Sequence, residues 1–312
     1  MKALQQIIRR VAENPSQAWA LATLVQTEGS TYRKPGARLL VERNGKTLGV
    51  LSGGCLEEEI GRYGKKVITT GSPVLLSFDT RRLYGCVGQL KILVEPLPAV
   101  GQQGNLITEI GRLLKNRQTC RVRTRFEGNT LGSDLLPSDV LLPAWRGILI
   151  DAVVLPVRLL LFGAGPEIES ITQFAVNLGW VIEHFAHPSL LPEDFRPDAQ
   201  TAALVMTHHF GRDLLALDRI LPLRLRYVGL LGPKKRHAEL LGRLSEYRPV
   251  DFALGNLFAP AGLDIGSEAP EEIALAIVSE VAAVLSNRTG GFLRERRTDS
   301  HTITKAAGAE AA

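Results

Sequence analysis

The second half of the chain alternates short apolar runs with amphipathic segments, and this alternation restricts the possible folds more than any other feature. The runs at residues 158–162, 181–186, 201–207 and 227–231 predict strands, and the segments at 167–178, 213–220, 237–244 and 271–285 predict helices. Strands that are apolar throughout must be buried on both faces. The pattern therefore predicts a parallel sheet covered on each side by helices.

The first half predicts a smaller, mixed α/β arrangement. Helices are expected at residues 3–13, directly after Cys55 and at 106–115, and strands at 18–27, 37–43, 47–51, 74–78, 90–97 and 120–126. Asn44-Gly45 is a typical two-residue hairpin signal between two of these strands. Residues 127–145 are rich in turn formers and predict no element. We therefore expect an α/β protein with domains at 1–145 and 156–290 and a disordered tail at 291–312.

Composition and charge exclude several classes of protein. A hydrophobic content of 45% with 22% charged residues is typical of a soluble globular chain. The net charge of +5 suits an anionic small molecule and is too weak to indicate a nucleic-acid partner. The N-terminus shows no secretory pattern, and the apolar stretch 148–162 is interrupted by Asp151, Pro156 and Arg158, so no membrane span is expected. We expect a cytoplasmic protein.

The turn Ser52-Gly53-Gly54-Cys55 places a thiol where a strand gives way to a helix. The two glycines permit a tight turn and close approach of a ligand. A helix N-terminus favours the thiolate form of Cys55, although the three glutamates that follow oppose this effect. Two interpretations remain open: a reactive thiol, or a small buried hydrophobe.

A second thiol, Cys86, lies between glycines in a loop at residues 79–88 that joins two predicted strands. Cys55 and Cys86 would then converge at one sheet edge, where two thiols beside cationic loops suit a thiophilic metal or persulfide chemistry. The third cysteine, Cys120, starts a strand and is expected to be structural. Three cysteines without a CxxC spacing argue against a disulfide framework and against a structural zinc site.

The loop at residues 29–38 carries the cations Arg33, Lys34 and Arg38 between glycines and hydroxyl residues. Such a composition suits a phosphate-bearing ligand. An ordinary solvated basic loop is the alternative.

The strand at 158–162 runs into Gly163-Ala164-Gly165 and then a helix, an arrangement typical of Rossmann-like folds that hold a pyrophosphate at the helix N-terminus. The third glycine of the fingerprint is replaced by Ile168, and the next strand ends at Ala186 instead of an acidic residue. His208 follows another strand and is expected at the same crevice. NAD(P) is therefore only an alternative ligand.

These motifs, taken in order, resemble the XdhC/CoxI family of molybdenum-enzyme accessory proteins. The resemblance rests on the segments Glu28-Gly29-Ser30, Arg33-Lys34-Pro35-Gly36-Ala37-Arg38, Ser52-Gly53-Gly54-Cys55-Leu56-Glu57, Gly85-Cys86, Val94-Glu95-Pro96-Leu97, Leu161-Phe162-Gly163-Ala164-Gly165, Leu178-Gly179-Trp180, Met206-Thr207-His208, Tyr227-Val228-Gly229-Leu230-Leu231-Gly232, Leu263-Asp264-Ile265-Gly266 and Pro270-Glu271-Glu272-Ile273-Ala274. The family usually has Asp and Arg where this chain has Ala186 and Pro188.

The resemblance implies an XdhC/CoxI-type N-terminal domain, a Rossmann-like C-terminal domain, and a chaperone of molybdenum cofactor (molybdopterin) more than a catalyst. Such a protein supports cofactor sulfuration, with a cysteine desulfurase as sulfur donor, and inserts the cofactor into a xanthine-dehydrogenase-like molybdenum hydroxylase. We further expect a homo-oligomer without nucleic-acid or membrane partners.

The implied site residues are Cys55 as principal thiol and metal ligand, Cys86 as helper, the phosphate-holding Arg33, Lys34 and Arg38, and the turn Ser52, Gly53 and Gly54. The alternative function is an NAD(P)-dependent oxidoreductase that uses Gly163 and Gly165, with His208 as proton donor. A scaffold that only recruits the target enzyme is a third possibility.

Overall fold

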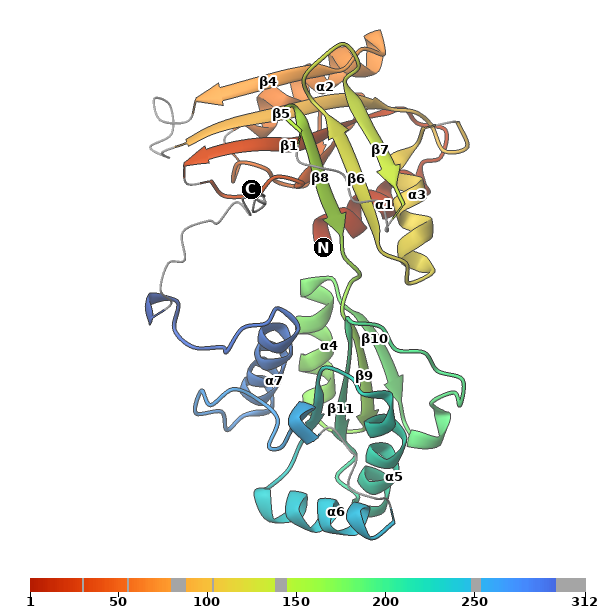
Figure 1. Cartoon of the computed structure of the whole chain (residues 1–312), viewed down its shortest axis with the longest axis vertical. Coiled ribbons are helices and arrows are strands. Elements are labelled where there is room, and N and C mark those ends of the chain that lie inside the picture. The colour runs from red at the N-terminus through yellow and green to blue at the C-terminus, as the bar shows by residue number, and fades with distance from the viewer. Residues whose placement is uncertain are drawn as a thin grey trace, which may run out of the picture. The chain divides into compact units, whose positions relative to one another are not determined.

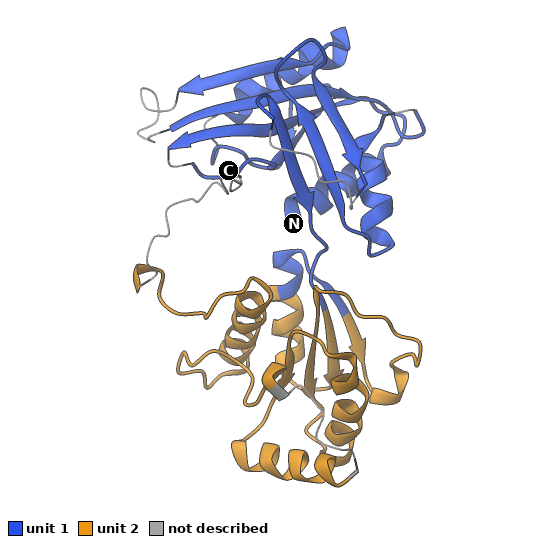
Figure 2. Cartoon of the chain, in the orientation of Figure 1, with its two compact units in different colours: residues 1–158, 175–182 blue, residues 159–174, 183–312 orange. Residues whose placement is uncertain are grey.

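The computed structural model describes residues 1–29, 31–54, 56–79, 88–102, 104–137, 145–247 and 254–295. The chain forms two compact units (Figure 2). The first comprises residues 1–158 and 175–182, and the second comprises residues 159–174 and 183–312. Most of the predicted disordered tail, residues 296–312, lies outside the described residues.

The first unit is built on a five-stranded sheet in the order β3-β2-β1-β5-β4. Its strands are β1 (Trp19–Gly29), β2 (Arg38–Val41), β3 (Thr47–Leu48), β4 (Val74–Asp79) and β5 (Gly88–Leu97), and each neighbouring pair is antiparallel. The central strand β1 is buried on both faces: Trp19 and Leu21 belong to one core, whereas Ala20 and Ala22 belong to the other. This explains why its sequence is apolar without alternation.

Three helices cover the two faces of this sheet. Helices α1 (Lys2–Glu13) and α3 (Leu106–Lys115) pack into the core that contains Trp19, and α2 (Glu57–Thr70) packs into the opposite core. Helix α3 has the predicted bounds because Asn105 caps it, accepting a hydrogen bond from the Thr108 amide at 2.9 Å. Helix α2 ends where Gly71 adopts a left-handed conformation.

A second, three-stranded antiparallel sheet has the order β7-β6-β8. Its strands are β6 (Cys120–Arg125), β7 (Gly132–Leu136) and β8 (Ile148–Val153). Only β6 was predicted. Strand β7 is attached to β5 by Glu95, which accepts hydrogen bonds from the Ser133 amide (2.8 Å) and hydroxyl (2.6 Å).

Most of the predicted parallel sheet, in the order β10-β9-β11-β12-β13, lies in the second unit. Its strands are β9 (Arg158–Gly163), β10 (Val181–Phe185), β11 (Thr201–Met206), β12 (Val228–Leu230) and β13 (Leu257–Phe258), of which β13 was not predicted. Pairs β11–β12 and β12–β13 are parallel. The order is that of a doubly wound Rossmann-like fold, in which the crevice between the first and third strands is the usual ligand position.

Helices lie on both sides of this sheet, with α4 and α7 on one side and α5 on the other (Figure 1). They are α4 (Glu167–Leu178), α5 (Phe210–Ile220), α6 (Lys234–Tyr247) and α7 (Pro270–Leu285). Helix α5 begins three residues earlier than predicted because His209 caps it, accepting from the Arg212 amide at 3.4 Å. No helix in the described ranges is long and apolar enough to cross a membrane.

The predicted hairpin at Asn44-Gly45 is present, but its turn is longer than the two-residue loop expected, since the Glu42 amide donates to the Lys46 carbonyl and the Gly45 amide to the Glu42 carbonyl. Strand β3 is also shorter than expected. The hairpin turn packs tightly against α2: a Cβ on Gly61 would lie only 2.3 Å from the carbonyl oxygen of Gly45. Gly61 is therefore needed for helix and hairpin to approach each other.

We expect Gly61→Ala to lower the free energy of unfolding of the first unit by about 1–3 kcal/mol, because the added methyl group meets backbone and overpacks the contact. The helix propensity of alanine offsets this loss by about 1 kcal/mol at most. Denaturant unfolding checks the prediction. Thr69→Ala on the exposed side of the same helix should change stability by less than about 0.5 kcal/mol; equal effects of the two variants would contradict it.

Candidate functional site

The basic loop at residues 29–38 is anchored to β8 by a buried ion pair. Arg38, which is 7% exposed, donates two hydrogen bonds to Asp151 of β8, at 2.9 and 3.0 Å, and a third to the Gly36 carbonyl at 3.2 Å. Gly36 has φ +92°, and a Cβ there would lie 3.0 Å from the Asp151 Cβ. Both the left-handed conformation and the lack of space require glycine at this position.

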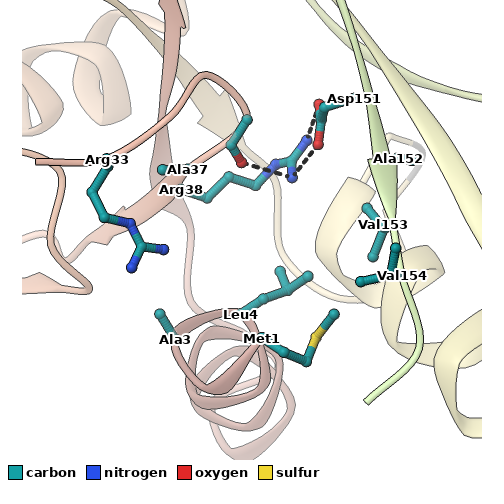
Figure 3. Close-up of a pocket in the computed structure, with 11 residues that line it drawn as sticks. Met1, Ala3, Leu4, Arg33, Ala37, Arg38, Asp151, Ala152, Val153 and Val154 are labelled. Atoms are coloured by element: carbon teal, nitrogen blue, oxygen red, sulfur yellow. Dashed lines mark hydrogen bonds and ion pairs between the residues drawn. The ribbon is translucent and has the colours of Figure 1, made fainter. Parts of the chain in front are cut away.

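The remaining two cations of the loop are exposed, and one of them lines a cavity of about 190 Å³ (Figure 3). Arg33 forms part of its wall, together with the Arg38–Asp151 pair and apolar side chains such as Leu4 and Val153. Lys34 is exposed on the same loop. The three predicted phosphate ligands thus differ in setting: Arg38 is engaged inside the protein, whereas Arg33 and Lys34 are accessible.

The turn that precedes Cys55 is organised by Glu57, in the first turn of α2. Its carboxylate accepts hydrogen bonds from the amides of Leu51 (2.9 Å), Ser52 (2.9 Å) and Leu56 (3.1 Å) and from the Ser52 hydroxyl (2.6 Å). Burial tends to raise the pKa of Glu57, but the hydrogen bonds from Ser52 and Leu51 outweigh burial and leave the pKa below its ordinary value of 4.5. Ser52 is therefore used to hold the turn in shape.

The basic loop and the thiol-bearing turn lie side by side. A Cβ on Gly53 would be 3.8 Å from Cγ of Tyr32, so the Tyr32 ring rests against the turn. Tyr32 is 72% exposed, and its neighbour Arg33 lines the cavity. Gly53 and Gly54 have φ of +82° and +112°, and no atom of the described residues lies within 4 Å of a Cβ built on Gly54. The structure thus brings two separate predicted motifs together.

Two of the three cysteines, Cys55 and Cys86, lie outside the described residues, so their predicted convergence stays a prediction. Cys120 is buried and free, as expected of a structural cysteine, and burial raises the pKa of its thiol. Within the described ranges, no three His, Cys, Asp or Glu side chains gather in a way that would hold a metal ion.

The second unit places Gly163, Gly165 and His208 together at the crevice between β9 and β11. A Cβ on Gly163 would lie only 2.2 Å from the Met206 carbonyl oxygen, so this glycine lets the two strand ends approach. A Cβ on Gly165 would lie 3.0 Å from Nε2 of His208. The sequence predicts Gly163, Gly165 and His208 at one crevice, and it does not single out Glu167, which lies beside Gly165 and is 7% exposed.

Two family profiles match the chain. The profile described as "XdhC and CoxI family" matches residues 13–79, and the profile described as "XdhC Rossmann domain" matches residues 159–281. The chain belongs to the XdhC and CoxI family. The first match contains the basic loop and the Ser52–Gly54 turn, and the second contains Gly163, Gly165 and His208.

Relatives of this XdhC and CoxI protein align along most of its length. A Bacillus subtilis protein, described as a probable subunit of xanthine dehydrogenase, is 27% identical over 84% of this chain and 91% of its own. The "Molybdenum cofactor insertion chaperone PaoD" of Escherichia coli is 26% identical over 85% of this chain and 82% of its own. A crystal structure described as a xanthine dehydrogenase from Bacillus halodurans superposes with a TM-score of 0.75 at 26% identity, covering 93% of this chain and 97% of that one.

We expect Asp151→Asn to destabilise the first unit by about 3–5 kcal/mol, because it removes the carboxylate that pairs with the buried Arg38 guanidinium. Denaturant unfolding measures the loss. The control is Asp134→Asn, in the same unit, whose ion pairs to Arg123 and Arg125 join side chains that are about one-third exposed; it should cost about 1 kcal/mol or less. Equal costs for the two variants would contradict the prediction.

Glu57→Gln should be less stable than the wild type at neutral pH, and the difference should shrink as the pH falls through the lowered folded-state pKa of Glu57. The reason is that a depressed carboxyl pKa contributes stability that is fully present only above the unfolded-state pKa. Urea unfolding between about pH 3 and 7 measures this difference.

Glu95→Gln provides a control of opposite sign. Burial raises the pKa of Glu95 in spite of its hydrogen bonds from Ser133. The stability of wild type relative to this variant should therefore fall as the pH rises. The same pH trend for both variants would show that the two carboxyl groups are not perturbed as described.

Proposed function

We propose that this protein is an accessory chaperone that binds molybdenum cofactor and inserts it into a xanthine-dehydrogenase-like molybdenum hydroxylase in the cytoplasm. Family membership and the name of the E. coli relative support this role. The observation that carries this proposal is that one loop, residues 29–38, borders two features: its Tyr32 contacts the turn before Cys55, and its Arg33 lines a cavity.

The cavity accommodates one end of the cofactor. Its volume of about 190 Å³ is below the roughly 300–1,000 Å³ of pockets that enclose a whole small-molecule ligand. In our proposal the terminal phosphate enters the cavity and is held by Arg33, with Lys34 at the rim, because charge-assisted hydrogen bonds favour a phosphate there. Arg38 acts indirectly by holding the loop against Asp151.

The rest of the cofactor would extend along the exposed Tyr32 ring towards the turn at Gly53 and Gly54. A flat aromatic ring stacks well on a flat heterocycle. At Gly54, no atom of the described residues lies within 4 Å of a Cβ position, which permits close approach. Cys55 would then reach the metal end as a thiolate, with Cys86 as helper, while a cysteine desulfurase supplies the terminal sulfur. A homo-oligomer is part of the same proposal.

We expect Arg33→Ala to weaken binding of molybdenum cofactor by roughly 10- to 100-fold, the range expected when a hydrogen bond to a charged group is lost. Anaerobic titration read by ultrafiltration and pterin fluorescence measures the affinity. Arg62→Ala, which removes an exposed cation from α2, is the matched control and should bind as the wild type does. Unchanged binding by Arg33→Ala would contradict the proposal that this loop binds the phosphate of the cofactor.

Cys55→Ala should bind less cofactor and fail to deliver sulfurated cofactor to the apoenzyme. Cys120→Ala should bind and deliver the cofactor as the wild type does, because the thiol of Cys120 is buried in the core. The readout is the activity of the reconstituted hydroxylase. Normal delivery by Cys55→Ala would refute the thiol assignment, and absence of cofactor binding by the wild type would refute the chaperone function itself.

A further inference from the structure

One buried carboxylate of the second unit has an oxygen without a hydrogen-bond partner in the described part of the chain. Glu167 lies in the first turn of α4, and its side chain is 10% exposed. Its Oε2 atom is buried and has no hydrogen-bond partner among the residues that the structure describes. A buried carboxylate without a donor is unfavourable, so such a group is expected where a ligand supplies the donor.

This carboxylate lies over the Gly163-Ala164-Gly165 turn. A Cβ on Gly165 would be 2.6 Å from Glu167 Oε2 and 3.0 Å from His208 Nε2, so the two side chains approach the same glycine. Oε2 and Nε2 are 3.9 Å apart, which is longer than a hydrogen bond. His208 therefore lies beside the carboxylate without satisfying it.

The neighbouring charges are already balanced. Asp213, which is 1% exposed, accepts hydrogen bonds from the Thr207 amide (3.1 Å) and hydroxyl (2.5 Å) and pairs with Arg236. These contacts hold the end of β11, where His208 adopts a left-handed conformation with φ 55°. Arg236 is thus paired with Asp213, and Glu167 has His208 beside it at 3.9 Å.

The position is the one at which a Rossmann-like fold would bind pyrophosphate. In that arrangement the amides of the glycine turn and the helix N-terminus face the phosphate. Here a carboxylate of the chain itself lies at this helix N-terminus, where it interacts favourably with the helix dipole. A phosphate entering the same space would meet a like charge at short range, which is strongly unfavourable.

We propose that the crevice between the ends of β9 and β11 binds its ligand through a positively charged nitrogen group, an ammonium or amidinium, and rejects phosphate. Glu167 is the specificity-determining residue: it accepts hydrogen bonds from the ligand and occupies the space of a pyrophosphate. Glu167 and His208 lie in the space that a side chain at residue 165 would fill, and His208 is half-exposed beside Gly165. The proposal does not depend on the function proposed for the first unit.

Titration of the full chain with methylguanidinium and with inorganic pyrophosphate, read from the amide resonances of Gly163, Gly165 and His208, tests this inference. In the wild type, methylguanidinium should shift these resonances saturably and pyrophosphate should not. In Glu167→Gln the methylguanidinium response should be lost, and pyrophosphate should bind about tenfold more tightly or better, since a like charge is removed.

Two further variants keep the test decisive. Glu169→Gln makes the same charge change in the same helix turn, but its side chain is exposed and hydrogen-bonded by Gln173 at 3.2 Å; it should behave as the wild type does. Glu167→Asp retains the charge and should still reject pyrophosphate. Equal pyrophosphate binding by wild type and Glu167→Gln, or a methylguanidinium response that survives in Glu167→Gln, would overturn the proposal.

Discussion

The ion pair between Arg38 and Asp151 is the contact on which the first unit depends most. It joins β2 to β8 across 113 residues of chain through two parallel hydrogen bonds. Burying two charges is unfavourable unless their geometry is well matched, and the planar guanidinium provides that match. Because the same arginine also binds the Gly36 carbonyl, the pair fixes the course of the basic loop. Arg38 and Asp151 also line the cavity beside Arg33, and the same loop carries Tyr32, whose ring lies against Gly53.

Three other buried acids show two different uses of a carboxylate. Glu57 and Glu95 are satisfied by nearby amides and hydroxyls, and each holds a segment in place: the turn before α2 and strand β7, respectively. Glu167 is buried to a similar degree and has an oxygen without a partner in the described part of the chain. The hydrogen-bonded carboxylates of Glu57 and Glu95 stabilise the fold, whereas the unsatisfied oxygen of Glu167 supports the ligand site that we propose. The first unit thus carries an exposed pair of cations in its basic loop, and the second carries a buried acid beside its glycine turn.

Much of the fold was predictable because it rests on local periodicity. Helices at 106–115 and 167–178 have the predicted bounds, the Asn44-Gly45 hairpin formed, and the parallel sheet followed from its apolar runs. Strands β7 and β8 were missed for a physical reason. Strand β7 is half-buried and polar, and β8 carries Asp151 in its centre, so neither shows a clear apolar alternation. Both are stabilised by pairing with β6, a partner that no local pattern reveals.

The amino-acid sequence by itself determined the two-part α/β plan, the positions of the glycine turns and the family to which the chain belongs. Those features depend on residue type and short-range spacing, which are visible without a structure. Only the tertiary structure decided the roles of the charged groups: Arg38 supports the loop, Arg33 faces a cavity, and Glu167 covers the glycine turn. The role of a charged side chain depends on its burial and on its partners, and these partners come from segments distant in the chain. The same residue type can therefore hold the fold in one place and bind a ligand in another.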